Sequence, residues 1–221
     1  MSLSTDYSTA KKPANLAIVD SNHIDLSHLN VDARTVLTFW FDKENEQYWF
    51  EQNANFDWQI KERFGKIWQA AKQGECATWR IAEAPTDCNS SVTALAGRLA
   101  EIIVLDQFSR NLCRNQPCAF AQDGMALVLA QEVIQQPYFD TLPMQWRKFM
   151  IMPFMHSEST VIHERYLPLF EKLDDAITLE FEQRHREILE QFGRYPHRND
   201  ALNRKSTTEE LEFLQQPDSS F

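Results

Sequence analysis

The chain has 221 residues, of which 43% are hydrophobic and only 5 are glycine. A chain of this length can bury a large core, so disorder throughout is excluded, and the scarcity of glycine argues against a turn-dense all-β fold. The formal net charge of −10 argues against general nucleic-acid binding, because a strongly acidic protein repels phosphate.

Residues 1–30 are polar and aperiodic, which predicts a flexible N-terminal tail ahead of a single helical domain over residues 31–221. A short apolar patch lies within the tail, at residues 16–19. The tail has no apolar signal core, and no apolar run approaches the roughly 20 residues that a membrane span requires. We therefore expect a cytoplasmic protein without a membrane partner.

Four cysteines occur in the chain, at positions that match neither a zinc site nor a CxxC redox motif. They are Cys76, Cys88, Cys113 and Cys118. We expect them to be reduced and to act as small apolar side chains.

From residue 31 onward, apolar residues recur with the period of 3.6 that is typical of an α-helix. A first helix begins at residue 31. A second, over residues 56–73, ends at Gly74, a residue type common just after helices. Residues 79–90 have the composition of a loop, and the helix over residues 92–110 has the clearest apolar stripe.

The second half of the chain continues with shorter helices. Pro117 suits the first turn of a helix that extends to about residue 136. Pro143 opens a helix that is apolar on every side and therefore buried, and Pro153 is expected to close it. Two further helices follow, over residues 162–173 and 177–192.

A capping box formed by Ser206 and Glu209 is expected to start the last helix. No convincing alternation of apolar and polar residues competes with the helical period. The sequence therefore predicts an all-α fold of about eight helices in antiparallel pairs, stacked as a tetratricopeptide-like array or a bundle.

Polar residues occupy positions where the apolar stripe of the third helix predicts burial. These are Asp106, Gln107 and Arg110, and the spacing of Asp106 and Arg110 allows an ion pair. Buried charges must be paired and hydrogen-bonded. The three residues form either a structural network that fixes the helix end or the floor of a pocket.

Histidines and arginines form further candidates. His185 lies on an apolar helix face, and His156 and Glu158 directly follow the buried helix, where Glu158 also suits a helix N-terminus. Six lysines and arginines lie between residues 184 and 205, against three acidic residues, in an otherwise acidic chain. This region is either solvated surface or an anion site, since arginine presents a planar fork suited to phosphate or carboxylate.

Four blocks carry a resemblance to a known family. LDQFSRN (105–111), MPFMHSE (152–158), FGRYPHRN (192–199) and RKSTTEELEFL (204–214) resemble the bacterial domain-of-unknown-function-924 family. The resemblance covers residues 31–221 and implies an all-helical, tetratricopeptide-like fold. It implies no established reaction, substrate or catalytic residue.

Two functions of different classes fit these residues, and neither calls for a metal or a cofactor. The first is a binding module whose groove or pocket takes a peptide or a small anionic molecule. The second is a small-molecule enzyme that uses histidine as acid or base and arginine as an anion clamp. The catalytic candidates are His156, Glu158 and His197. The ligand-binding candidates are Asp106, Gln107, Arg110, Asn111, His156, Glu158, His185, Arg194, His197, Arg198 and Asn199. The oligomeric state is not indicated.

Overall fold

The computed structural model describes residues 24–81, 88–217 and residue 219. All regular elements in this part of the chain are helical, which confirms the predicted all-α fold. The α-helices are α1 (Val31–Trp40), α2 (Ala54–Lys72), α3 (Cys88–Ile102), α4 (Ser109–Leu112), α5 (Asp123–Val133), α6 (Met144–Met155), α7 (Thr160–Glu171), α8 (Ala176–Phe192) and α9 (Thr208–Phe213). Within the described ranges, no helix is both long and apolar enough to cross a bilayer.

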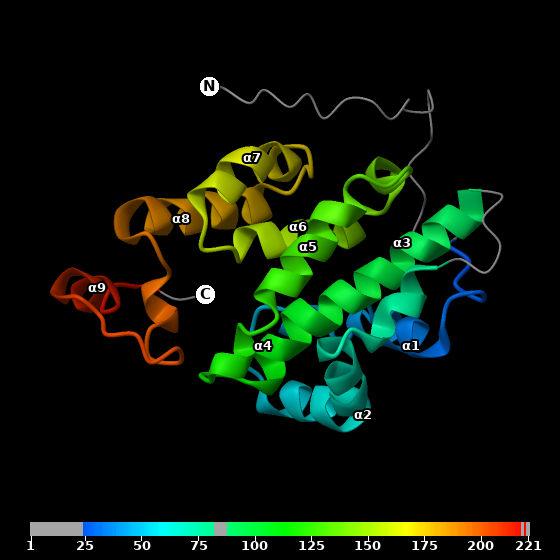
Figure 1. Ribbon diagram of the computed structural model, residues 1–221, viewed down its shortest axis with the longest axis horizontal. Helices are drawn as coiled ribbons and strands as arrows, with labels where there is room; N and C mark the ends of the chain where they lie inside the picture. Colours follow the sequence, from blue (N-terminus) through cyan, green and yellow to red (C-terminus); the bar gives the residue numbers. More distant parts are fainter. Residues whose placement is uncertain (1–23, 82–87, 218, 220–221) are drawn as a thin grey trace.

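Helices α1 to α3 lie together on one side of the molecule, and α7, α8 and α9 lie on the other (Figure 1). Helices α4, α5 and α6 lie between these two sides. From α5 to α8 each helix packs on the next along the chain, whereas α1 packs mainly on α3. The tetratricopeptide-like stacking of helix pairs stays a prediction.

Side-chain caps and glycine set the ends of the first two helices. The side chain of Asn30 accepts hydrogen bonds from the first turn of α1, and Asn53 does the same for α2. Gly74 has a φ of 77°, the left-handed conformation that ends α2 as predicted. Leu29 is buried. The apolar patch at 16–19 lies outside the described residues, and the division into a tail and one domain stays a prediction.

A cluster of aromatic rings forms the centre of the core. The ring of Trp40, which is fully buried, lies within 6.0 Å of the rings of Trp49, Phe56, Phe108 and Phe149. These side chains come from α1, the segment between α1 and α2, α2, the segment after α3, and α6. The aromatic cluster therefore joins parts of the chain that are distant in sequence, and its burial supplies a large share of the hydrophobic stabilisation.

Two of the predicted helix boundaries at proline are wrong. Pro117 starts only the short 3-10 turn Pro117–Ala119, and α5 begins later, at Asp123. Pro153 lies inside α6, which continues to Met155. A proline costs a helix one backbone hydrogen bond. Because α6 is buried along most of its length, packing holds this helix beyond the proline.

The capping box at the last helix is shifted by one residue from the prediction. Thr207, not Ser206, caps α9, and its partner is Glu210, not Glu209. Both registers satisfy the sequence pattern. Glu210 is buried and is held by Arg194 at 2.6 Å, and this tertiary contact selects the observed register.

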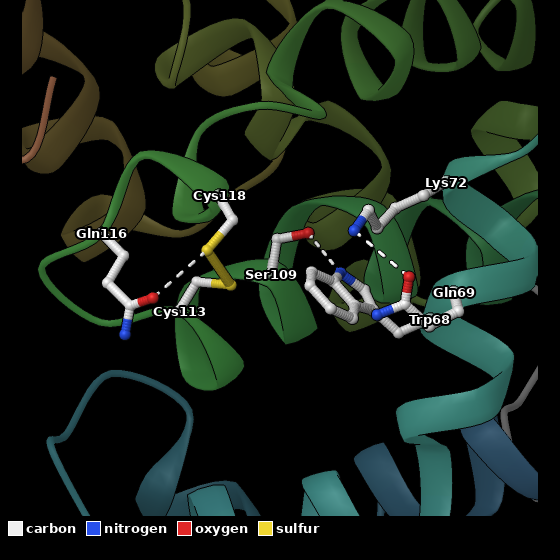
Figure 2. The surroundings of a disulfide bond; sticks show 7 residues. All are labelled: Trp68, Gln69, Lys72, Ser109, Cys113, Gln116 and Cys118. Carbon is white, nitrogen blue, oxygen red and sulfur yellow. Dashed lines mark hydrogen bonds between the residues drawn. A yellow bond between two sulfur atoms is a disulfide. The ribbon is translucent and has the colours of Figure 1, made fainter.

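The expectation that the cysteines are reduced is wrong for one pair. Cys113 and Cys118 form a disulfide, with their Cα atoms 5.6 Å apart (Figure 2). After α4 ends, Asn115 adopts a left-handed φ of 58° and the chain turns back on itself. The turn brings Cys118 next to Cys113. Cys76 is a buried free thiol, whose pKa burial raises to about 12.

Candidate functional site

A π-helical turn positions the polar residues that the sequence places on the stripe of the third helix. Residues Ile103–Phe108 form this turn between α3 and α4, and all six side chains are buried. π-helical turns inside α-helices are frequent at functional sites. The predicted burial of Asp106 and Gln107 is thus confirmed.

Asp106 receives several polar contacts at its buried carboxylate. Nη1 of Arg110 lies 3.1 Å from Oδ1, which confirms the predicted ion pair. Nδ1 of His156 lies 2.7 Å from the same oxygen, and Nε2 of Gln107 donates to Oδ2 at 2.6 Å. Burial opposes the ionisation of Asp106, but the charge of Arg110 and the hydrogen bonds of His156 and Gln107 outweigh it, so the pKa lies below its usual range.

A second carboxylate, Asp123 at the start of α5, joins two arginines. Arg110 Nη1 lies 3.0 Å from Asp123 Oδ1, and Arg198 Nη1 donates to Oδ2 at 2.9 Å. Arg198 Nη2 also donates to the carbonyl of His156, at 3.0 Å. We name Asp106, Arg110, Asp123, His156 and Arg198 the Asp106 cluster. Two carboxylates and two guanidinium groups balance in charge there while His156 is neutral.

Three imidazoles lie in and beside the Asp106 cluster. The ring of His156 lies 6.4 Å from that of His185, and Tyr195 lies between His185 and His197, at 5.4 and 5.6 Å. Burial lowers the pKa of His156 and of His185, and it lowers that of His197 to about 3. All three histidines are therefore neutral at pH 7.

Other predicted site residues belong to neighbouring networks instead. Arg194 binds Glu210 through two nitrogens, at 2.6 and 2.7 Å. It therefore does not point to a common cavity with Arg110 and Arg198, as a shared anion site would require. Asn199 also contacts Glu210, at 3.2 Å.

Two more candidates are held by partners that the sequence did not indicate. The carboxylate of Glu158 accepts hydrogen bonds from both terminal nitrogens of Arg204, at 2.7 and 2.9 Å, and from the backbone N–H of Tyr195. Asn111 donates to Asp57 on α2, at 2.8 Å. Each of these networks ties α4 or the segment after α6 to another part of the chain.

Sequence reasoning missed a second buried pair of histidine and carboxylate. His163 Nδ1 lies 2.6 Å from Glu182 Oε1, and both side chains are fully buried. Nε2 of His163 lies 3.0 Å from the carbonyl of Ser157 and 3.1 Å from the hydroxyl of Tyr195. Nothing in the sequence spacing signals this pairing, because His163 and Glu182 lie on different helices, α7 and α8.

An open hollow of about 640 Å³ lies beside the Asp106 cluster, between the 3-10 turn Pro196–Arg198 and α9. We name it the α9 hollow. Its lining consists of Pro196, His197, Asp200, Arg204, Lys205, Ser206, Leu211 and Leu214. His197 lines the hollow, and its ring also stacks on that of Tyr195, which in turn contacts the ring of His185. Among the described residues, no three histidine, cysteine or acidic side chains converge as a metal site.

The fold and site define an all-helical protein with a charge-balanced polar cluster in its interior. The chain belongs to the family described as bacterial protein of unknown function (DUF924), whose sequence profile matches residues 36–218. It is similar to a solved structure of a protein of unknown function from Agrobacterium tumefaciens, with 32% identity and a TM-score of 0.72. That match covers 83% of this chain and 96% of the other. No curated protein matches the chain.

Proposed function

We propose that the protein binds a small anionic molecule, or the acidic group of a peptide, in the α9 hollow. The observation that carries the proposal is the lining of the hollow, where two cationic side chains, an imidazole and a hydroxyl face one carboxylate. The two cations outnumber the one carboxylate of the lining, in a chain whose net charge is −10. We also propose that the protein binds this anion in the cytoplasm, the location expected from the sequence.

The cations of the hollow differ in how their charge is balanced. Arg204 is paired with Glu158 and also donates to the carbonyl of Tyr195 at 3.0 Å, which fixes its position. Lys205 is exposed, and no carboxylate of the described residues forms an ion pair with it. Lys205 therefore supplies the charge, while Ser206 and neutral His197 supply directional hydrogen bonds. Leu211 and Leu214 form an apolar wall on one side of the hollow.

Anions should raise the melting temperature of the wild type, because a ligand of the native state stabilises by mass action, by about 2.7 kcal/mol at a hundredfold excess over the Kd. Phosphate, sulfate and succinate would be compared with chloride at equal ionic strength. Lys205→Ala should lose at least half of the shift. Lys61→Ala, which removes an exposed lysine on α2, should keep all of it.

The control separates binding from the general stabilisation that sulfate and phosphate give to folded proteins. That general effect acts on all variants alike. Equal shifts in the wild type, Lys205→Ala and Lys61→Ala would therefore disprove the proposed site, as would the absence of any shift in the wild type.

A second function, acid–base catalysis by His156, is supported by a different observation. The contact of 2.7 Å between Asp106 and Nδ1 of His156 fixes the tautomer that carries its proton on Nδ1. Nε2 is then free of a proton and can accept one from a substrate. Arg110 contacts the same Asp106 oxygen as His156, and Arg198 donates to the backbone carbonyl of His156. The charges of both guanidinium groups therefore lie near the ring and favour a substrate that becomes negative in the reaction.

Nitrogen-15 NMR of the imidazole tests this tautomer. We expect His156 to be protonated on Nδ1 only at pH 7, and to become charged only at a pH below the usual range of histidine, since its pKa is lowered. Asp106→Asn should remove the preference for Nδ1. A charged ring at pH 7, or a ring protonated on Nε2, would rule out His156 as the base.

A further inference from the structure

The Cys113–Cys118 disulfide closes a surface loop between α4 and the turn Pro117–Ala119 (Figure 2). The two cysteines of this disulfide differ in their exposure to solvent. Cys113 is buried, with 5% of its surface exposed, whereas Cys118 is only half-buried. A thiol in solution can therefore approach the sulfur of Cys118, and Cys113 is the leaving group.

The segment that follows this disulfide carries two groups that hold the Asp106 cluster. The ring of Phe120 lies 4.6 Å from the guanidinium of Arg198 and 5.8 Å from that of Arg110. Three residues further on, Asp123 pairs with both arginines. The backbone N–H of Phe120 donates to Pro117 at 3.2 Å, and that of Asp123 donates to Phe120 at 3.1 Å. Consecutive turns thus connect the disulfide with the cluster.

The other side of the loop has anchors of its own. The side chain of Arg114 binds Asp57 on α2 at 2.5 Å, and Asn111 binds the same carboxylate. Ser109 accepts a hydrogen bond from the indole of Trp68 at 2.9 Å (Figure 2). These contacts hold α4 to α2 without the disulfide. Opening the disulfide therefore releases the side of the loop that leads to Phe120, not the side that leads to α4.

We propose that Cys113 and Cys118 form a reversible redox site, and that its reduction by a dithiol loosens the hold of Phe120 and Asp123 on the two arginines. The reductant's thiolate attacks Sγ of Cys118, the S–S bond breaks, and Cys113 leaves as a thiolate that takes up a proton. The reductant's second thiol then attacks the mixed disulfide and frees Cys118. The reductant supplies two electrons and becomes a disulfide. The site is independent of what the α9 hollow binds.

Full-length Cys76→Ser/Cys88→Ser protein tests the proposal, because the proposed pair holds its only cysteines. The protein would be equilibrated with reduced and oxidised dithiothreitol at set ratios, without denaturant, and trapped with N-ethylmaleimide. Mass spectrometry should count two adducts after reduction and none after reoxidation. Hydrogen exchange over residues 114–123 should be about tenfold faster in the reduced protein, with α7 unchanged as an internal reference.

The variant that also carries Cys113→Ser and Cys118→Ser cannot form the disulfide. Its hydrogen exchange over residues 114–123 should match that of the reduced protein under both reducing and oxidising conditions. The reduced and oxidised forms of the parent protein provide the comparison even where this variant folds poorly. A pair that millimolar dithiothreitol leaves oxidised in the native protein would overturn the proposal. So would equal exchange over residues 114–123 in the two redox states.

Discussion

Replacing Asp106 by alanine should lower the free energy of unfolding by about 3–5 kcal/mol, the range for breaking a buried ion pair by removing one partner. The substitution leaves Arg110, His156 and Gln107 without the carboxylate that they share. Arg110 retains Asp123, so part of its charge stays balanced. Urea denaturation, followed by tryptophan fluorescence, measures the change.

A double-mutant cycle with Arg110→Ala isolates the pair. The double variant should be less destabilised than the sum of the two single variants, by about 1 kcal/mol or more, because each single change already removes the attraction between the two charges and the second change cannot remove it again. Additive losses would mean that the contact of 3.1 Å between the two side chains contributes no coupling.

Replacing Gly97 by alanine should cost about 3 kcal/mol or more, through overpacking of a rigid contact. A Cβ atom at this position of α3 would lie 1.7 Å from the carbonyl oxygen of Trp79 and 2.6 Å from its carbonyl carbon. Because these are backbone atoms, the whole 3-10 segment Glu75–Arg80 must move away. Two contacts oppose that movement: Arg80 binds Glu101 at 2.6 and 2.7 Å, and Arg98 donates to the Arg80 carbonyl.

Gly65→Ala is the matched control, since Gly65 also lies inside a helix, α2, but apart from its chain neighbours and the nearby backbone of α2 no atom lies within 4 Å of its added Cβ. Alanine should stabilise the protein there by about 0.5–1 kcal/mol, because it lowers the entropy of the unfolded chain. Thermal and urea denaturation of both variants provide the test. Equal effects at the two positions would contradict the close approach at Gly97.

The helices could be predicted from sequence wherever the apolar period is long. Helices α2 and α8 end just before Gly74 and Gly193, in agreement with the predicted ranges 56–73 and 177–192, because the left-handed conformation there favours glycine. The boundaries failed where tertiary packing overrides local preference. Pro153 does not end α6, because the surrounding core holds the helix.

The candidate site was predictable only in part. An apolar stripe placed Asp106 and Arg110 in the interior, since periodicity reports which face of a helix is buried. It carries no information about partners on other elements. Asp123, which holds Arg110 and Arg198 together, and the pairing of His163 with Glu182 depend on how the helices pack. The six lysines and arginines between residues 184 and 205 predicted positive charge near Lys205, but they did not predict the hollow that Lys205 lines.

The most direct test of the anion site is a crystal structure of the protein grown with selenate, a sulfate analogue whose selenium gives an anomalous signal. We predict an anomalous peak in the α9 hollow, within hydrogen-bond distance of Lys205 and His197. The peak should disappear in crystals of Lys205→Ala grown in the same condition. Selenate bound only elsewhere, in crystals where the hollow is open to solvent, would contradict the account.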